Sequence, residues 1–510
     1  MPKKPLEGIK VVGFTWYVAG PQTTKTLAAC GAEVISIEGR TRVDPQRTTG
    51  PYKDGESGVD RSGDFNQYNA GKMSIALNLA DPKGVEIAKK LVARADVVVE
   101  NYAGGVMKRM GLGYEDLRKV KPDIIMLSAC MQGQTGPHAD HPGTGYQLTA
   151  LSGFYYITGW PDEEPSPPDG PYPDYIVPRF SVLAILAALD YRRRTGKGQY
   201  LDLSQYENAV HFLSPLILDN VVNQRVATRV GNSSPYAAPH GVYRCRSEDR
   251  WCGISVATDE EWGIMRWLMS ETEWVQEDRF STLEGRRENE AELDTLMEEW
   301  TKERSPGEIT NMLRRFNMPV RRLERGEAEL AEDAEFTERA AVAVPHGAYS
   351  CKSEDRWCAI VVQTDEEWQS FCRVIGNPEW TKDAKFSTLK SRQENEEEMD
   401  RLIGEWTVNL SAEEVMNRMQ EAGVAAGILE TGQDLMDKDP QLKYRGLFEE
   451  LDHPEIGKYR AAGTAFKLSK SLTQLKSAPT LGEHNEYILK ELLGMPDEEV
   501  VQLVIEGAVE

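Results

Sequence analysis

The chain has 510 residues, of which 40% are hydrophobic and 28% charged, a composition typical of soluble globular proteins with several domains. Its formal net charge of −23 argues against a general binder of nucleic acid or of acidic membranes, since both partners are polyanions. The first residues lack the apolar core of a secretion signal, and no uninterrupted apolar run approaches about 18 residues. The sequence therefore predicts a cytoplasmic protein without membrane or nucleic-acid partners.

Strands and helices alternate in the amino-terminal part of the chain. Strands are expected at residues 8–14, 31–38, 68–79, 96–100 and 123–129, and helices from Pro21 and over residues 82–95. This alternation predicts an α/β fold with a doubly wound parallel sheet, in which ligands bind at the carboxyl ends of the strands. The turn after the first strand has no GxGxxG pattern, so a dinucleotide site is not supported.

Basic residues follow several strands of this predicted sheet. Arg40 begins a long polar loop over residues 40–66, Lys72 lies in a turn before a strand, and Lys108 and Arg109 lie in a helix. Cations that converge at strand ends suit a polyphosphate ligand. For each residue taken singly, a solvated surface charge is the simpler explanation.

One carboxylate, that of Asp174, stands just ahead of an apolar helix. A loop rich in proline, aspartate and glycine (residues 163–173) leads to it, and the helix is expected at residues 179–190. The backbone N–H groups of a first helical turn favour an acidic residue there and favour its ionised form, so the local pattern explains Asp174 as a helix starter. A carboxylate without a histidine–serine or metal cluster beside it also suits a general base or a nucleophile.

A segment in the middle of the chain occurs twice, 106 residues apart. Residues 239–262 and 345–368 are identical at 18 of 24 positions, and the register continues without a gap to Trp300 and Trp406. Each copy is expected to form a hairpin followed by helices, which predicts a tandemly duplicated α+β small domain inserted into a discontinuous large domain. The expected boundaries give residues 1–235 and 448–510 to the large domain and residues 236–341 and 342–447 to the two copies.

The histidines and cysteines of the two copies receive structural interpretations. His240 and His346 each lie in a repeated Pro-His-Gly turn, where a structural role is favoured over catalysis. Zinc sites generally use closely spaced cysteines together with histidine, whereas the cysteines here have six residues between the partners. We therefore expect hairpins that carry buried free thiols, and no metal. The pairs are Cys245/Cys252 and Cys351/Cys358.

Several stretches outside the duplication occur in the order found in one enzyme family. They are LEGIKVVGFTWYVAGP (6–21), GAEVISIE (31–38), YNAGKMSIALNL (68–79), RADVVVENYAGGVMKRMGL (94–112), the Asp174 helix through RRTGKGQYLDLSQYE, and APTLGEHN (478–485). In these motifs the sequence resembles the class III coenzyme A transferases, which include formyl-CoA, carnitine and benzylsuccinate CoA-transferases. The second copy of the small domain departs from the usual length of that family.

The resemblance implies a CoA-transferase that moves CoA from an acyl-CoA donor, such as succinyl-CoA, to a carboxylic acid. Asp174 matches the family's catalytic aspartate, which forms mixed-anhydride and aspartyl-CoA thioester intermediates. Gly143 and Gly145 would belong to a glycine-rich loop that covers the site and supplies oxyanion donors. The CoA thioester would be a substrate and no cofactor would be tightly bound. The residues that the resemblance implies for CoA binding are Val18, Ala19, Arg40, Lys72, Asn101, Tyr102 and Arg109.

One departure in the site and three open alternatives accompany this resemblance. Val18 stands where formyl-CoA transferase-like members have glutamine, which puts oxalate as acceptor in doubt, and the nearby aromatic residues suit an aromatic or branched acid. An α-methylacyl-CoA racemase would need a His–Asp pair where this chain has Thr144 and Gly145. A non-catalytic CoA-binding subunit of a hetero-oligomer is the other alternative. The family forms interlocked homodimers, so we expect a homodimer, with a heterodimer as the alternative. The aromatic residues are Trp16, Tyr17, Tyr155, Tyr156 and Trp160.

Overall fold

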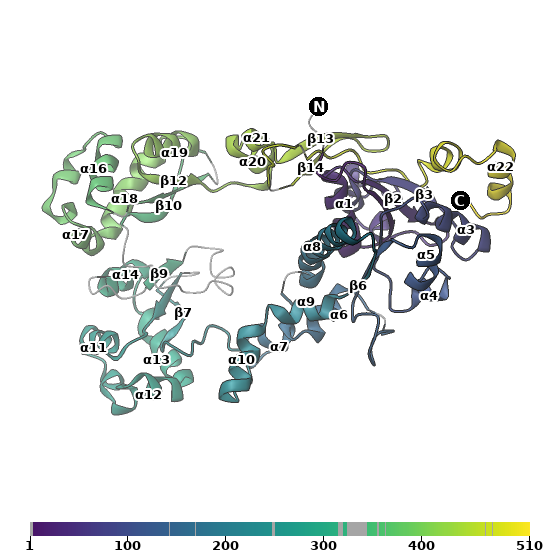
Figure 1. The fold of residues 1–510 in the computed structure, drawn as a ribbon. Helices are drawn as coiled ribbons and strands as arrows, with labels where there is room; N and C mark the ends of the chain where they lie inside the picture. The colour runs from purple at the N-terminus through teal and green to yellow at the C-terminus, as the bar shows by residue number, and fades with distance from the viewer. Residues whose placement is uncertain are drawn as a thin grey trace. The chain divides into compact units, whose positions relative to one another are not determined.

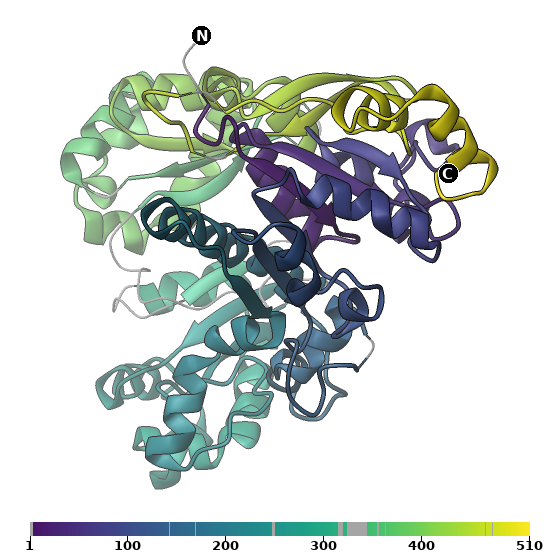
Figure 2. The same cartoon turned by 45° about the vertical axis from the view of Figure 1, so that its right-hand side comes forward.

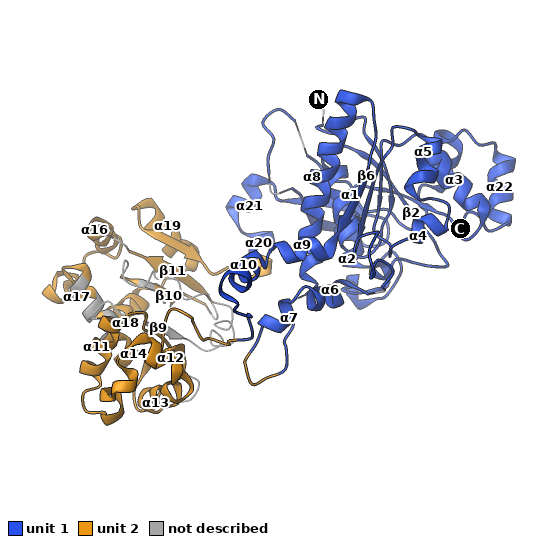
Figure 3. Ribbon diagram, turned by 60° about the horizontal axis from the view of Figure 1, so that its bottom comes forward, with its two compact units in different colours: residues 1–159, 164–229, 434–510 blue, residues 160–163, 230–433 orange. Residues whose placement is uncertain are grey.

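The computed structural model describes residues 4–141, 143–168, 170–246, 250–314, 320–323, 344–353, 356–362, 364–464, 466–471 and 473–510. The chain divides into two compact units (Figure 3). The first contains residues 1–159, 164–229 and 434–510, and the second contains residues 160–163 and 230–433. The first unit is therefore discontinuous in sequence. The expected division at 235, 341 and 447 remains a prediction.

A six-stranded sheet forms the centre of the first unit, with every neighbouring pair of strands parallel. Its strand order is β3-β2-β1-β4-β5-β6, so the order reverses between β1 and β4. This topology confirms the predicted doubly wound α/β fold. The strands are β1 (Lys10–Phe14), β2 (Glu33–Glu38), β3 (Met73–Ala76), β4 (Val97–Glu100), β5 (Ile125–Cys130) and β6 (Tyr200–Ser204).

Helices cover both faces of this sheet (Figure 1). Alternate strand residues such as Val12 and Val98 point into one apolar cluster, while Val11 and Val97 point into another on the opposite face. The first cluster includes residues of α3, α5 and the carboxyl-terminal helices, and the second includes residues of α1 and α8. The helices are α1 (Ala19–Ala29), α2 (Gly63–Asn69), α3 (Pro82–Val92), α4 (Val106–Arg109), α5 (Tyr114–Val120), α6 (Gly145–Leu151), α7 (Phe154–Ile157), α8 (Tyr172–Thr195), α9 (Gln205–His211), α10 (Ser214–Asn223), α20 (Gly432–Asp437), α21 (Pro440–Arg445), the π-helical η8 (Tyr487–Leu492) and α22 (Asp497–Ile505).

The carboxyl-terminal segment returns to the amino-terminal strands, and the yellow and purple parts of the ribbon lie side by side in Figures 1 and 2. Backbone atoms make this contact: the amide of Ala76 donates to the Asn485 side chain at 2.8 Å, and His484 N donates to Ser74 O at 3.0 Å. The predicted return of this segment to the large domain thus has a direct hydrogen-bonded basis. A separate hairpin of β13 (Phe448–His453) and β14 (Gly457–Ala462) precedes this return.

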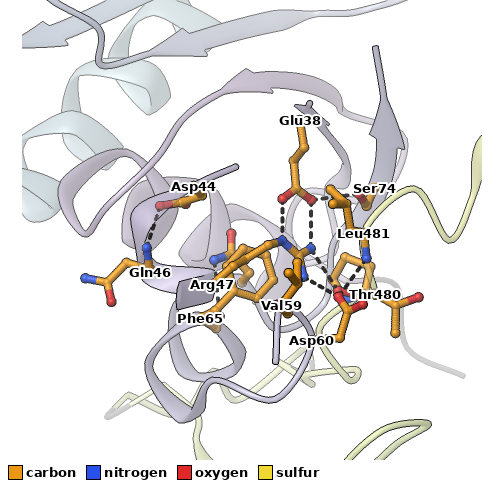
Figure 4. A network of polar contacts seen from close by, with 12 residues as sticks. Glu38, Asp44, Gln46, Arg47, Val59, Asp60, Phe65, Ser74, Thr480 and Leu481 are labelled. Carbon is orange, nitrogen blue, oxygen red and sulfur yellow. Dashed lines mark hydrogen bonds and ion pairs between the residues drawn. The ribbon is translucent and has the colours of Figure 1, made fainter. Parts of the chain in front are cut away.

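A buried arginine reinforces the return (Figure 4). Arg47, with no exposed surface, pairs with Glu38 through Nε at 2.7 Å and with Asp60 through Nη1 at 2.6 Å, and its guanidinium lies 3.5 Å from the ring centre of Phe65. It also donates to the carbonyl of Pro479 at 3.2 Å. A buried guanidinium needs this number of acceptors, because an unpaired buried charge is strongly destabilising. Arg47 therefore links the loop after β2 to the carboxyl-terminal segment.

The second unit contains two three-stranded antiparallel sheets, β7-β8-β9 and β10-β11-β12, and each has its own apolar core. The repeated sequence thus forms a repeated series of elements, a hairpin followed by helices and a third strand. The first series is β7 (His240–Arg244), β8 (Trp251–Ser255), α11 (Asp259–Leu268), α12 (Leu283–Glu288), α13 (Glu290–Lys302), α14 (Pro306–Arg314) and β9 (Val320–Leu323). The second is β10 (His346–Ser350), β11 (Trp357–Val361), α16 (Asp365–Val374), α17 (Leu389–Glu394), α18 (Glu396–Thr407), α19 (Ala412–Glu421) and β12 (Ala425–Ile428).

Equivalent buried arginines hold each copy together. Arg286 donates to the carbonyl of Ala238 at 2.6 Å and pairs with Asp259 at 3.0 Å. Arg392, 106 positions later, donates to the carbonyl of Val344 at 3.2 Å and pairs with an aspartate at 2.8 Å. Each guanidinium also lies over a buried tryptophan of its own copy. The duplicated sequence therefore preserves a structural core in both copies.

Two expected elements of the first unit were wrong in their bounds. Residues 40–66 are not wholly irregular, because α2 begins at Gly63 after Ser62, whose hydroxyl accepts a hydrogen bond from Phe65 N at 3.2 Å. The helix expected from Arg179 begins at Tyr172, since Pro173 fits a first helical turn and the helix continues through Pro178.

Among the described residues, α8 is the one helix that is long and apolar enough to span a membrane. Core helices can be equally long and apolar, and 39% of the apolar window of α8 is buried.

Candidate active site

Asp174 lies in the first turn of α8, within the helix and not ahead of it. Pro178 follows four positions later and has no N–H, so the carbonyl of Asp174 lacks the usual helical partner. Asp174 is half-buried and its neighbours Pro173 and Val177 are buried, which fixes this turn against the rest of the unit. The helix start thus presents the carboxylate from a rigid segment.

Gly145, the first residue of α6, lies directly against the Asp174 carboxylate. A Cβ atom added at position 145 would lie 2.4 Å from Asp174 Oδ2 and 2.5 Å from Pro171 Cβ, closer than real Cβ contacts come. The residue is buried, whereas Gly143 two positions earlier is exposed and neighbours the flexible end of Met131. The structure therefore brings Gly145 to the catalytic candidate and leaves Gly143 on the loop before it.

The Asp174 carboxylate has neither a cation nor a hydrogen-bond donor beside it among the described residues, and burial raises its pKa to about 7. The expectation that helix N–H groups would favour its ionised form is outweighed, because desolvation penalises the charge. The charge of Asp174 is felt by Tyr68 of α2. Burial, and then a hydrogen bond with Tyr175, raise the pKa of Tyr68, and the charge of Asp174 adds to that shift.

The point where the strand order reverses carries four of the residues implied for CoA binding. Asn101, after β4, accepts a hydrogen bond from Trp16 N at 3.0 Å and donates to Trp16 O at 2.9 Å. Gly20 permits this contact, since a Cβ there would lie 2.6 Å from Asn101 Oδ1. Open α/β sheets bind ligands at such a reversal. The implied residues at this point are Val18, Ala19, Asn101 and Tyr102, of which Val18 and Ala19 are buried at the start of α1.

The three implied cations lie in different surroundings. Arg40, after β2, is exposed and donates weakly to Leu481 O at 3.5 Å. Arg109 is exposed at the end of α4. Lys72 is buried, with Nζ 2.6 Å from Asn69 Oδ1, and burial lowers its pKa to about 7 despite the nearby charges of Glu38 and Asp44.

Sequence reasoning missed Arg42, which lies over Trp16 at 4.7 Å from the ring centre. Trp16 also meets Tyr102 edge-on at 5.2 Å and Tyr17 at 5.7 Å. The sequence did not indicate this stacking, because Arg42 lies in a polar loop without a pattern that relates it to Trp16. Of the other aromatic residues proposed near the acyl group, Tyr155 and Tyr156 lie in α7, in the same unit as Trp16, and Trp160 belongs to the second unit.

The histidine and cysteine interpretations are consistent with the geometry of the described residues. His240 Nδ1 lies 2.5 Å from Asn232 O, whereas the side chain of His346 lies outside the part of the chain that the structure describes. All four cysteines of the two pairs are buried and none forms a disulfide. No group of three or more histidine, cysteine, aspartate or glutamate side chains among the described residues could hold a metal ion.

Comparisons with known proteins bear on this arrangement. The model of CoA-transferase family III matches residues 6–344 and again residues 329–485. A succinyl-CoA:glutarate CoA-transferase of Mus musculus is 27% identical over 509 residues, which cover 99% of this chain and 91% of that protein. A succinyl-CoA–D-citramalate CoA-transferase of Chloroflexus aurantiacus is 30% identical over 345 residues, covering 68% of this chain and 84% of that protein.

A solved structure has the same fold. The crystal structure of a CAIB/BAIF family protein from Brucella suis superposes with a TM-score of 0.55 and 26% sequence identity, covering 96% of this chain and 99% of that chain. The family model covers nearly all of the sequence and matches it twice, consistent with the repeated segment. The carboxylate on α8, the reversal of strand order and these matches lead to one conclusion: the chain belongs to CoA-transferase family III.

Proposed function

We propose that the protein transfers CoA from an acyl-CoA donor, with succinyl-CoA as the donor of choice, to a carboxylic acid, and that Asp174 is the nucleophile. The observation that carries this proposal is the Asp174 carboxylate, which lies against Gly145 and has no hydrogen-bond or ionic partner among the residues that the structure describes. A structural aspartate at a helix start normally accepts hydrogen bonds, which lower its pKa. The carboxylate here keeps its lone pairs available at an energetic cost, which is typical of functional groups.

The proposed steps conserve the energy of the thioester. A carboxylate oxygen of Asp174 attacks the thioester carbonyl carbon, the C–S bond breaks, and a mixed anhydride and CoA thiolate form. The thiolate then attacks the Asp174 carbonyl carbon and expels the donor acid, leaving an aspartyl-CoA thioester. The acceptor carboxylate attacks the Asp174 carbonyl carbon and expels the thiolate, which gives a second anhydride. The thiolate then attacks the acceptor acyl carbon of that anhydride, and the new acyl-CoA and the Asp174 carboxylate are released. Each step exchanges one carboxylate or thiolate for another, so no net proton moves.

The surrounding residues receive matching roles. Gly143, in the loop before α6, and Gly145, where α6 begins, would supply backbone N–H groups that stabilise the tetrahedral oxyanions, and the loop would exclude water. CoA would lie along the reversal point of the sheet, between Val18–Ala19 and Asn101–Tyr102. Arg40, Lys72 and Arg109 would bind the CoA phosphates. The two arginines are better placed to do so, because they are exposed and Lys72 is buried. The CoA thioester remains a substrate, and no tightly bound cofactor is proposed.

The racemase alternative is opposed by the space at position 145. A side chain there would overlap the Asp174 carboxylate and Pro171, so a histidine–aspartate pair in the pattern of that enzyme does not fit. The relatives named above act on succinyl-CoA with glutarate or D-citramalate, which favours a dicarboxylic acceptor over the aromatic or branched acid suggested by Trp16 and Tyr17.

We also propose a homodimer in the cytoplasm. The exposed faces of α8 and α10 are apolar, with Leu183 64%, Leu218 61% and Val222 73% exposed. Exposed apolar side chains on helices suit an interface, and a second copy is the partner that the family resemblance implies. A different second chain is the alternative, and the mass of the purified particle distinguishes the two.

The test is covalent trapping. The protein is incubated with succinyl-CoA, hydroxylamine is added, and peptides containing Asp174 are analysed by mass spectrometry for the hydroxamate that an aspartyl thioester forms. We expect the adduct in the wild type and its loss in Asp174→Asn, together with CoA transfer to glutarate. Proton exchange at an α-carbon without an adduct would support the racemase instead. Activity that appears only after a second chain is added would support the subunit alternative.

A further inference from the structure

The loop between β5 and α6 (residues 131–144) leads from the sheet to Gly145, and one residue attaches it to three other segments. The backbone N–H of Gln134 donates to Asp202 on β6, at 2.9 Å from Oδ1 and 3.2 Å from Oδ2. Its side-chain Nε2 donates to Glu100 Oε1 at 3.1 Å, and its Oε1 accepts from Gly105 N at 3.0 Å. Both ends of the amide are therefore used, one as donor and one as acceptor.

Glu100, the acceptor in this network, ends β4 with 1% of its surface exposed. Its second oxygen accepts from Tyr102 N at 2.8 Å. Burial raises its pKa to about 7 against the lowering effect of the hydrogen bond from Tyr102 N, and the charge of Asp202 raises it further. The buried side chain thus holds the start of the turn that contains Asn101 and Tyr102.

A second contact brings the same loop against the same turn. Gly104 N donates to Ala139 O at 3.1 Å, and a Cβ at position 104 would lie 2.2 Å from that oxygen. The loop is therefore held at Gln134 and Ala139 on one side and ends at Gly145 against Asp174 on the other. No other connection between the turn and the nucleophile is needed, since the loop contacts both.

We propose that Gln134 is a positioning residue: its side chain joins Glu100 to Gly105 N and thereby sets the loop that places Gly145 over the Asp174 carboxylate. This inference rests on the proposed function of Asp174 and goes beyond it by naming the residue that couples the CoA turn to the loop over the nucleophile. A glutamine is required because the site offers one acceptor and one donor. No single acidic or apolar residue satisfies both.

The critical variant swaps the side chains of Glu100 and Gln134. In Glu100→Gln the new amide donor faces the Nε2 of Gln134, and rotation of Gln134 only moves the conflict to Gly105 N. In the double variant Glu100→Gln, Gln134→Glu, the amide at 100 can accept from Tyr102 N and donate to the carboxylate at 134, which accepts from Gly105 N. All three hydrogen bonds are restored, so this pair separates positioning from side-chain identity.

The measurements are kcat and KM for succinyl-CoA, thermal unfolding, and hydrogen exchange at residues 143–147. We expect Gln134→Met and Glu100→Gln to lower kcat by about 10²-fold, as a misplaced catalytic group does, with faster exchange at 143–147. The double variant Glu100→Gln, Gln134→Glu should recover most of the kcat and most of the protection from hydrogen exchange. The matched control is Gln132→Met, because the Gln132 side chain has no hydrogen bond within the described part of the chain; it should behave as the wild type.

Several results would overturn the inference. The first is an unchanged kcat in folded Gln134→Met. The second is an equal loss of kcat in the Gln132→Met control. The third is a kcat in the double variant as low as in the single variants. Hydrogen exchange is read in the absence of substrate, so it decides the positioning claim even where the wild type shows no adduct on Asp174. The absence of an adduct would contradict the proposed function without deciding the role of Gln134. Unchanged hydrogen exchange at residues 143–147 in Gln134→Met would contradict the role of Gln134 by itself.

Discussion

The contact between Gly145 and Asp174 makes Gly145→Ala the most direct test of the site. The added Cβ would lie 2.4 Å from Asp174 Oδ2 and 2.5 Å from Pro171 Cβ. Neither neighbour is the end of a long flexible side chain, since Asp174 is held in the first turn of α8 and Pro171 precedes it. We therefore expect the carboxylate or the whole helix start to shift, and the shift falls on the proposed nucleophile.

The magnitude follows from two opposing effects on stability. Overpacking at a close contact costs about 1–3 kcal/mol, while alanine in a helix is favoured over glycine by up to about 1 kcal/mol. The net loss is then at most about 3 kcal/mol, which leaves a protein of ordinary stability folded. A displacement of the reacting group by about 1 Å lowers the rate by about 10²-fold. We therefore expect kcat to fall by about this factor in a variant that is still folded.

The assay compares kcat for CoA transfer, the midpoint of thermal unfolding and the yield of the Asp174 adduct. Gly404→Ala, in α18 of the second unit, is the matched control, because a Cβ there would have no neighbour within 4 Å among the described residues. We expect the control to keep near wild-type kcat. Equal kcat in the two alanine variants would refute the reasoning, since it would mean that the contact at position 145 does not govern the nucleophile.

Three further predictions follow. Asp174→Asn should abolish transfer, and its unfolding midpoint relative to the wild type should rise between about pH 4 and pH 7, because burial raises the pKa of Asp174 from 3.8 to about 7. Arg47→Met should cost about 3–5 kcal/mol of stability and speed hydrogen exchange at residues 479–482, because it leaves Glu38 and Asp60 without their buried cation. Leu218→Glu should dissociate the proposed dimer in light scattering, whereas Val120→Glu, at an exposed position on α5, should not.

The alternation of strands and helices made the sheet predictable. Apolar runs such as those around Val11 and Val97 are buried on both faces, and a chain with that pattern forms a parallel sheet with few alternatives. The bounds of α8 were not predictable in the same way. Two prolines, Pro173 and Pro178, suggested a loop, but proline is compatible with a first helical turn and tertiary packing outweighed the loss of one hydrogen bond.

The site shows a similar division between what sequence could and could not provide. The resemblance predicts Asp174, Asn101 and Gly145 as site residues, and each lies at a strand end or a helix start, where position in sequence determines position in the fold. Lys72 carried the same signal, yet it is buried against Asn69, and no sequence pattern distinguishes a buried lysine from an exposed one. The attachments of Gln134 depend on three segments that meet only in the folded chain, so they were not predictable.

The sign of the pH dependence separates the two interpretations with which Asp174 began. A helix-capping aspartate has a lowered pKa, so it stabilises the protein above its unfolded pKa and the stability is lost as the pH falls. A desolvated nucleophile has a raised pKa, so stability is greatest below the ordinary value of 3.8 and is lost as the pH rises through about 7. Attack on the thioester requires the ionised form, so activity should increase over the pH range in which stability declines. A residue that serves structure alone would not link stability and activity in opposite directions. Burial of Asp174 without a partner among the described residues produces that opposition here.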